Sequence, residues 1–349
     1  MTSYIEAHEF SGALLAWYDR HGRSLPFRGT KDPYRIWLSE IMLQQTRTAS
    51  VGAYYERFLA AFPDVFSLAA AKEEEVLKMW EGLGYYSRAR NLHQAARVIA
   101  AEYKGRFPAD YDALRALPGV GPYTAAAVAS IAFDLPEPAV DGNLTRVLTR
   151  ALGIREDASL PSVRRRITEE ARARMPRTRR GDFNQALMDL GATVCVPGTP
   201  DCEKCPLRAL CDAYDNGDPE NLPVLPRKTP PITLRYAVLL VLWEGRVYMK
   251  KRGEGLLNGL YVYMMTEEEP EAALRRLGIE GGGLTPMGEA RHVFTHRVWD
   301  MDIYLCEART VPDALRNDFY TRAEMEALPI PTAMRAARRA LTEYWEKTS

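Results

Sequence analysis

The sequence predicts a mainly helical domain followed by a smaller α+β domain. The apolar period changes from that of helices to that of strands near residue 233, and a proline-rich stretch with neither period lies just before the change. With 349 residues, the chain is long enough for two hydrophobic cores. We therefore expect a helical domain at 1–214, an extended linker at 215–232 and a second domain at 233–349.

The individual elements follow from the same two periods. Apolar side chains in the first half recur at helical spacing, with turns at glycine and proline. After the linker, short apolar runs predict strands. The predicted helices of the first half are 10–22, 36–46, 51–62, 71–84, 87–103, 111–117 and 123–133, with further helices after them. The second half is predicted to hold strands at 236–243, 246–251, 259–265 and 297–308, and helices at 269–278 and 333–347.

Charge and hydropathy narrow the class of protein. Lysine and arginine balance aspartate and glutamate, so the formal net charge is zero. A net charge of zero is no evidence for or against nucleic-acid binding. Arginines crowd the segment 164–180, which is either a local phosphate-binding face or a solvated helix face. No apolar run reaches the length that crosses a membrane, so we expect no membrane partner.

Four of the five cysteines occupy one short stretch with the spacing C-x6-C-x2-C-x5-C. Four thiolates so close together suit a structural zinc ion or an iron–sulfur cluster. Zinc sites usually pair two C-x2-C knuckles, and only one such pair occurs here, so the spacing favours the cluster. No signal peptide is recognisable and a disulfide scheme would leave one cysteine over, so we expect a reducing, cytoplasmic compartment. The four are Cys195, Cys202, Cys205 and Cys211, and the fifth is Cys306.

The segment "LPGVGPYTAAAVASIAF", residues 117–133, predicts two helices joined by a very short turn. Pro122 suits the first turn of the second helix. Gly119 and Gly121 permit unusual backbone angles and leave N–H groups uncovered beside a helix N-terminus, where they can bind a phosphate oxygen without reading sequence. A bare turn of this kind is also common without any function.

Asp141 precedes a periodic helix, so the sequence predicts an N-cap. The helix dipole and the N–H donors stabilise a carboxylate there, so we expect Asp141 to stay ionised at neutral pH. An anion in this position can stabilise a cationic sugar.

Glu40 lies on a helix with apolar residues around most of its circumference, so we expect it to be buried and its pKa to be raised. A raised pKa makes a carboxyl group a useful proton donor. The alternative is a buried ion pair with Arg28 or Arg35. If Glu40 is the acid, the pKa values of Glu40 and Asp141 are shifted in opposite directions, as those of the two carboxyl groups are in glycoside hydrolysis.

Five blocks together resemble the adenine DNA glycosylase (MutY) family of the helix-hairpin-helix, endonuclease III-like superfamily, over essentially the full length. The blocks are "WLSEIMLQQT", "GLGYYSRARNL", "LPGVGPYTA", "VDGNLTRVLTR" and "FNQALMDLGATVC". The resemblance implies a [4Fe-4S] cluster on the four clustered cysteines and a base-excision-repair enzyme. Its substrate would be adenine mispaired with 8-oxoguanine or guanine in duplex DNA. Tyr123 stands where bifunctional relatives carry a Schiff-base lysine, so the resemblance implies a glycosylase without a strong lyase step.

The resemblance also implies roles for individual residues. Glu40 would protonate N7 of adenine, Asp141 would stabilise the sugar cation, and Tyr123 and Asn143 would support them. Phe27 departs from the tryptophan of many relatives, which affects the shape of the pocket. The adenine pocket would be lined by Arg28, Leu43 and Gln185, and DNA would be contacted by Gln45, Thr46, Tyr85, Gly119 and Gly121.

The second domain resembles the Nudix-like C-terminal module of the same family. The metal-binding REx2EE core of Nudix hydrolases is missing after "GLYVY", so pyrophosphate hydrolysis is not expected. Phe294, Thr295 and His296 match the family's 8-oxoguanine-recognition triplet. The resemblance further implies a monomer that acts on the bacterial nucleoid. Three rival functions remain: an endonuclease III-like enzyme for oxidised pyrimidines, a non-catalytic damage binder and a nucleotide-pool hydrolase.

Overall fold

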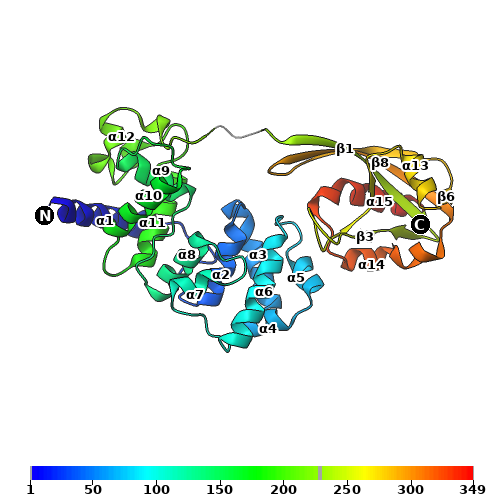
Figure 1. The fold of residues 1–349 in the computed structure, drawn as a ribbon, viewed down its shortest axis with the longest axis horizontal. Coiled ribbons are helices and arrows are strands. Elements are labelled where there is room, and N and C mark those ends of the chain that lie inside the picture. Colours follow the sequence, from blue (N-terminus) through cyan, green and yellow to red (C-terminus); the bar gives the residue numbers. More distant parts are fainter. Residues whose placement is uncertain (1, 227–229, 349) are drawn as a thin grey trace. The chain divides into compact units, whose positions relative to one another are not determined.

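The computed structural model describes residues 2–226 and 230–348, and it divides into two compact units. The first consists of Met1–Ala70 and Asn91–Arg227, and the second of Ala71–Arg90 and Lys228–Ser349. The chain passes between the units on either side of 71–90 and again inside the predicted linker, of which 227–229 lie outside the described residues (Figure 1). In the described part of the chain, no helix is long and apolar enough to cross a membrane.

The first unit is helical, as predicted (Figure 1). Helix α11 packs closely against α8 and α9 because it carries glycine where it meets each of them. A Cβ atom on Gly181 would lie 2.7 Å from Cα of Ile131 in α8, and one on Gly191 would lie 2.7 Å from Cβ of Asn143 in α9. The helices are α1 (Thr2–His21), α2 (Pro33–Leu43), α3 (Thr48–Ala61), α4 (Val65–Ala70), α6 (Ser87–Glu102), α7 (Tyr111–Arg115), α8 (Pro122–Phe133), α9 (Gly142–Ala151), α10 (Pro161–Arg174), α11 (Arg180–Thr193) and α12 (Asp212–Asp215).

The predicted helical hairpin is formed by α7 and α8. Gly119 has φ +72°, and a Cβ atom there would lie 2.5 Å from Cβ of Asn91, so the turn requires glycine at this position. Gly121 has φ −81° and is the N-cap of α8, with Pro122 at its first position. The hairpin therefore uses the left-handed region at one glycine only.

The second unit is built on a mixed sheet in which β1 (Ile232–Trp243) pairs in parallel with β8 (Arg297–Thr310). Residues of β1 alternate between two apolar clusters, since Val238 and Leu240 face one and Leu239 and Val241 face the other. Helix α15 (Arg335–Thr348) covers the first cluster and α13 (Pro270–Arg276) the second. The other elements are β2 (Arg246–Tyr248), β3 (Lys250–Lys251), β4 (Tyr261–Val262), β5 (Met264–Thr266), β6 (Glu280–Gly281), β7 (Thr285–Val293), β9 (Phe319–Tyr320), α14 (Arg322–Ala327) and α5 (Glu73–Met79).

The structure adds one long strand that the sequence did not predict. Strand β7 pairs with β8 along most of its length, but its side chains are largely exposed and show no apolar alternation. Only a few of its side chains, such as Met287 and Ala290, pack against the core, so the strand carries a weak hydrophobic signal in the sequence.

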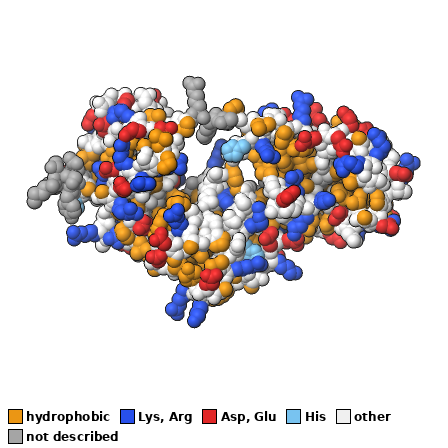
Figure 2. Space-filling model, viewed as in Figure 1, with side chains coloured by type: hydrophobic (Ala, Val, Ile, Leu, Met, Phe, Trp, Pro, Cys, Tyr) orange, Lys and Arg blue, Asp and Glu red, His pale blue; other side chains and the backbone are white. Residues whose placement is uncertain are grey.

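Basic and acidic side chains are interspersed over the face drawn in Figure 2, in keeping with the zero net charge. Several arginines of the 164–180 segment are paired with acids: Arg166 with Glu156, Arg172 with Glu137, and Arg174 with Glu170. This pairing favours a solvated helix face over a phosphate-binding one.

Candidate active site

A cavity of about 200 Å³ in the first unit collects residues from the beginning of the chain and from α2, α8, α9 and α11. All residues predicted to be catalytic and all those predicted for the adenine pocket line it, together with Thr46. The lining consists of Arg23, Leu25, Phe27, Arg28, Thr30, Ile36, Ser39, Glu40, Leu43, Thr46, Thr48, Tyr123, Ile131, Asp141, Asn143, Gln185 and Met188.

Glu40 is 7% exposed on α2, as its apolar helix predicts. Its Oε2 accepts a hydrogen bond of 2.6 Å from the Tyr123 hydroxyl, and neither candidate arginine forms an ion pair with it. Arg28 pairs with Asp189 instead, and Arg35 with Asp32. Burial raises the pKa of Glu40 above its ordinary value, although the Tyr123 hydrogen bond and the charge of Arg28 oppose the rise. The predicted direction of the Glu40 shift is confirmed.

Asp141 is the N-cap of α9, as predicted. Its Oδ1 accepts from the backbone N–H of Leu144 and its Oδ2 from Nδ2 of Asn143, both at 2.8 Å. The expectation that the pKa values of Glu40 and Asp141 shift in opposite directions is wrong for the free protein. Burial raises the pKa of Asp141 and outweighs the hydrogen bonds that lower it. The pKa values of both carboxyl groups in the cavity are therefore raised.

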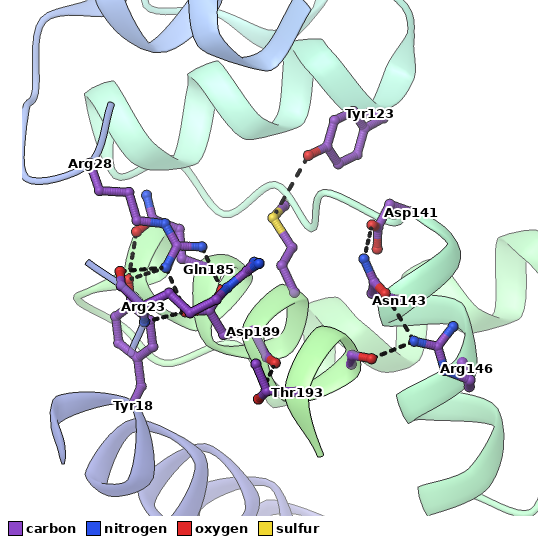
Figure 3. A network of polar contacts seen from close by, with 12 residues as sticks. Tyr18, Arg23, Arg28, Tyr123, Asp141, Asn143, Arg146, Gln185, Asp189 and Thr193 are labelled. Carbon is purple, nitrogen blue, oxygen red and sulfur yellow. Dashed lines mark hydrogen bonds and ion pairs between the residues drawn. The ribbon is translucent and has the colours of Figure 1, made fainter. Parts of the chain in front are cut away.

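The side chain of Asn143 is itself fixed by Arg146, which lies one turn further along α9 (Figure 3). Nη2 of Arg146 donates to Oδ1 of Asn143 at 2.9 Å and to the Gly191 carbonyl at 2.6 Å. Its Nε donates to the carbonyl of Cys195 at 2.7 Å. Asn143 is thereby held with its amide nitrogen toward Asp141, so the carboxylate has one preferred orientation.

Asp189 is a residue of the site that the sequence did not reveal. Its side chain is fully buried and binds Arg28 through both guanidinium nitrogens, at 2.5 and 2.7 Å (Figure 3). Arg23 donates to the same carboxylate from its backbone N–H and from Nε. Nearby, the Tyr18 hydroxyl donates to Oε1 of Gln185 at 2.7 Å. The available signal was a single carboxylate in the otherwise apolar run "ALMDLGA".

The phenol of Tyr123 stays protonated, because burial and the neighbouring carboxyl groups raise its pKa well above the ordinary value. Its hydroxyl donates to Glu40 and lies 3.7 Å from Sδ of Met188. Phe27 is buried, contacts Tyr55 edge-to-face and lines the cavity. Gln45 is exposed with φ +55°, just after α2.

A second cavity in the first unit is lined by all four clustered cysteines, together with apolar side chains such as Leu207. Nη1 of Arg150 donates to Sγ of Cys195 at 3.3 Å and to the Val196 carbonyl at 2.9 Å. All four thiols are free of disulfides. Among the described residues, no three or more His, Cys, Asp or Glu side chains converge as they would on one metal ion. Cysteine thiolates are the ligands of iron–sulfur clusters, and all four thiols line this one cavity.

The remaining predicted residues belong to the second unit. Phe294, Thr295 and His296 form the turn between β7 and β8, closed by a hydrogen bond of 2.8 Å from the Phe294 N–H to the Arg297 carbonyl. The Phe294 ring packs against Trp299 with the centroids 4.8 Å apart. Tyr85 is 46% exposed, and its hydroxyl lies 2.8 Å from Oγ1 of Thr295.

Comparison with known proteins places the chain among DNA repair enzymes. Residues 38–173 match the family of HhH-GPD superfamily base excision DNA repair proteins, and residues 237–340 match the NUDIX domain family. The adenine DNA glycosylase of Mus musculus is 33% identical over 97% of this chain and 79% of its own length. The adenine DNA glycosylase of Homo sapiens is also 33% identical, over 95% of this chain and 73% of its own length.

Solved structures resemble the helical part of the chain. A thermostable thymine-DNA glycosylase superposes with a TM-score of 0.57 and 32% identity, covering 62% of this chain and all of that one. An endonuclease III in a trapped covalent complex with DNA superposes with a TM-score of 0.51 and 24% identity, covering 59% of this chain and 94% of that one. At 24% identity, the similarity to endonuclease III supports the fold only.

Proposed function

The chain belongs to the adenine DNA glycosylase family, and we propose that it is a monofunctional enzyme that removes adenine mispaired with 8-oxoguanine, or with guanine, from duplex DNA. The observation that carries the proposal is one cavity lined by a buried acid, Glu40, and an oriented carboxyl group, Asp141, with the Tyr123 hydroxyl bonded to Glu40. The cavity lining contains no lysine in the part of the chain that the structure describes. The site therefore has two carboxyl groups and no amine to attack a sugar.

Adenine reaches such a cavity only after it leaves the base stack, which costs a few kcal/mol and less at a mispair. Glu40 then donates its proton to N7 of adenine, which makes the base a better leaving group. The raised pKa of Glu40 supports this role, because the acid form persists to higher pH. Arg28, Leu43 and Gln185 line the space for the base, and the ion pair with Asp189 sets the position of Arg28.

As the N-glycosidic bond breaks, positive charge develops on the sugar and Asp141 stabilises it. A nearby cation favours the ionised carboxylate, so the developing charge opposes the burial that raises the pKa of Asp141 in the free protein. Asn143 and the Leu144 N–H hold the carboxylate in place meanwhile. Water then adds to the sugar, and the product is an abasic site in an intact strand.

Cys195, Cys202, Cys205 and Cys211 would hold a [4Fe-4S] cluster in the second cavity. Four thiols around one cavity, with the Arg150 guanidinium donating to one of them, suit a thiolate-bound group. Bound there, the cluster would supply a covalent crosslink for the loop that follows α11. No catalytic step of the proposal depends on it.

The second unit would recognise the base opposite adenine. Phe294 would wedge beside 8-oxoguanine, and Thr295 and His296 would meet its edge from the turn between β7 and β8. Gln45 and Tyr85 would fill the vacated stack, Thr46 would contact DNA beside the cavity, and the backbone at Gly119 and Gly121 would bind phosphate. We propose that the enzyme acts as a monomer on the nucleoid in the bacterial cytoplasm.

Duplexes with one defined mispair test this function. Adenine opposite 8-oxoguanine should be released, and the strand should break only after alkali is added. A covalent complex trapped by borohydride would show a lyase and overturn the monofunctional assignment. A parallel duplex with thymine opposite guanine tests the activity named for the thymine-DNA glycosylase structure, and release of thymine but not adenine would overturn the substrate assignment.

A further inference from the structure

Asn184 on α11 is fully buried and lies outside the lining of the active-site cavity. Its amide bonds the segment 134–141, which joins α8 to α9 and ends at Asp141. We propose that Asn184 is a positioning residue for Asp141: it holds the segment that presents this carboxyl group to the cavity. The inference rests on the proposed function, since it concerns how Asp141 is placed to stabilise the sugar cation.

The hydrogen bonds of Asn184 define the orientation of its amide. A backbone N–H can only donate, so Oδ1 of Asn184 accepts from the Ala139 N–H, at 3.0 Å. A carbonyl can only accept, so Nδ2 donates to the Glu137 carbonyl, at 2.9 Å. Nδ2 also donates to Oγ of Ser130 in α8, at 2.8 Å. One buried side chain thus joins α11 both to α8 and to the segment that follows α8.

The segment before Asp141 is neither helix nor strand. Prolines at 136 and 138 have no N–H group to donate. The N–H groups of Glu137 and Val140 donate to carbonyls two residues before them, in three-residue turns. Ala139 is fully buried, where an N–H group without a partner would destabilise the fold. The bond to Asn184 therefore sets where the last residues of the segment lie.

Asp141 is held from both directions along the chain. After it, the N–H of Leu144 and the amide of Asn143 donate to its carboxyl group. Before it, the bond from Asn184 reaches Ala139, which is two residues away. Displacement of a reacting group by about 1 Å can cost about 10²-fold in rate. A loosened segment should therefore slow the chemistry without removing a proposed DNA contact.

Asn184→Ala tests the inference in the full-length protein. It removes the amide, so the single-turnover rate of adenine release opposite 8-oxoguanine should fall about 10- to 100-fold. The dissociation constant for a duplex with a 2′-fluoro adenine nucleotide, which resists excision, should stay at the wild-type value. In Asn184→Asp, burial keeps the carboxyl group protonated, so it still accepts from Ala139 and has one hydrogen to donate. Its rate should fall about two- to tenfold, as expected for one lost hydrogen bond.

Ser130→Ala is the matched control. It removes the third hydrogen bond of the same amide and leaves the segment 134–141 untouched, so it should keep the wild-type rate of adenine release.

The carboxyl band of Asp141 gives a readout that a loss of stability alone would not move. Difference infrared spectra against Asp141→Asn isolate this band in each background. Burial raises the pKa of Asp141, so a carboxyl group released towards solvent should titrate at a lower pH. We expect this decrease in Asn184→Ala and Asn184→Asp, and the wild-type midpoint in Ser130→Ala.

Four results would each overturn the inference: a wild-type rate in Asn184→Ala, an equal loss in Ser130→Ala, a larger loss in Asn184→Asp than in Asn184→Ala, or an unchanged titration of Asp141. If Asn184→Ala yields no folded protein, the rate and the titration of Asn184→Asp decide. Failure of the proposed function appears separately, as a wild-type protein that releases no adenine. The titration of Asp141 then still tests how this carboxyl group is placed.

Discussion

The two cavities of the helical unit are built against the same helix, α9, and differ in how their polar groups are satisfied. Near the N-terminus of α9, the carboxyl groups of Glu40 and Asp141 each accept hydrogen bonds from fixed neighbours. Near its C-terminus, Arg150 reaches a cavity where four thiols face apolar walls. The polar groups of the first cavity are hydrogen-bonded within the protein, whereas the thiols of the second would gain their bonding from the proposed cluster. In the proposed function, one helix therefore supports a site for chemistry and a site for structure.

Glu40→Gln should remove the proton donor of the first cavity and leave the second cavity unchanged. Glutamine can still accept from Tyr123 but has no proton to give, so adenine release should fall about 10²- to 10⁴-fold in single-turnover assays. Duplex binding and bound iron should match those of the wild type. Excision at the wild-type rate would remove Glu40 from the mechanism.

The same variant has a predicted pH signature in stability. The folded-state pKa of Glu40 is raised, so the wild type keeps this contribution to stability below about pH 4.5, the ordinary glutamate value, and loses it as the pH rises. Glutamine does not titrate. The free energy of unfolding of Glu40→Gln, relative to the wild type, should therefore increase with pH above that value, as measured by denaturant titration.

Cys205→Ser should weaken the binding of the proposed cluster in the second cavity. Removal of one of four thiolates should lower bound iron, and loss of a metal site is among the changes that cost about 4 kcal/mol or more of unfolding free energy. Cys306→Ser is the control, because Cys306 is buried in the sheet of the second unit. It should leave iron content unchanged. Wild-type iron in Cys205→Ser would exclude Cys205 as a ligand.

Asp189→Asn tests whether the first cavity depends on the buried ion pairs beside it. The substitution leaves the guanidinium groups of Arg23 and Arg28 without their buried anion and should cost about 3 kcal/mol of unfolding free energy. Asp19→Asn removes an exposed pair with Arg179 and should cost about 1 kcal/mol or less. Equal losses in the two variants would contradict a special role for the buried pairs.

Much of this site could be predicted from local patterns. The N-cap at Asp141, the tight turn at Gly119 and the burial of Glu40 each depend on a few neighbouring residues, and each is found in the structure. The partner of Glu40 could not be predicted in the same way, since Tyr123 lies 83 positions away and meets it only through the packing of α2 and α8.

Two further features of the site could not be predicted from the sequence, for the same reason. The pKa of Asp141 was expected to follow its local donors, but burial, a property of the whole fold, decides its direction. The ion pairs of Asp189 with Arg23 and Arg28 join α11 to residues near the start of the chain. The sequence pattern of α11 predicts a helix but not these partners. Local chemistry predicted which groups are present, and tertiary packing determined their partners and their electrostatics.

The proposed role of Glu40 requires that burial keep this carboxyl group available as an acid, and its titration is the most direct test. Difference infrared spectra of wild type and Glu40→Gln, recorded across pH, isolate the carboxyl band of this residue. The midpoint should lie above 4.5, and Tyr123→Phe should raise it further, because the Tyr123 hydrogen bond favours the charged form. A midpoint at or below 4.5 in the wild type would contradict the account.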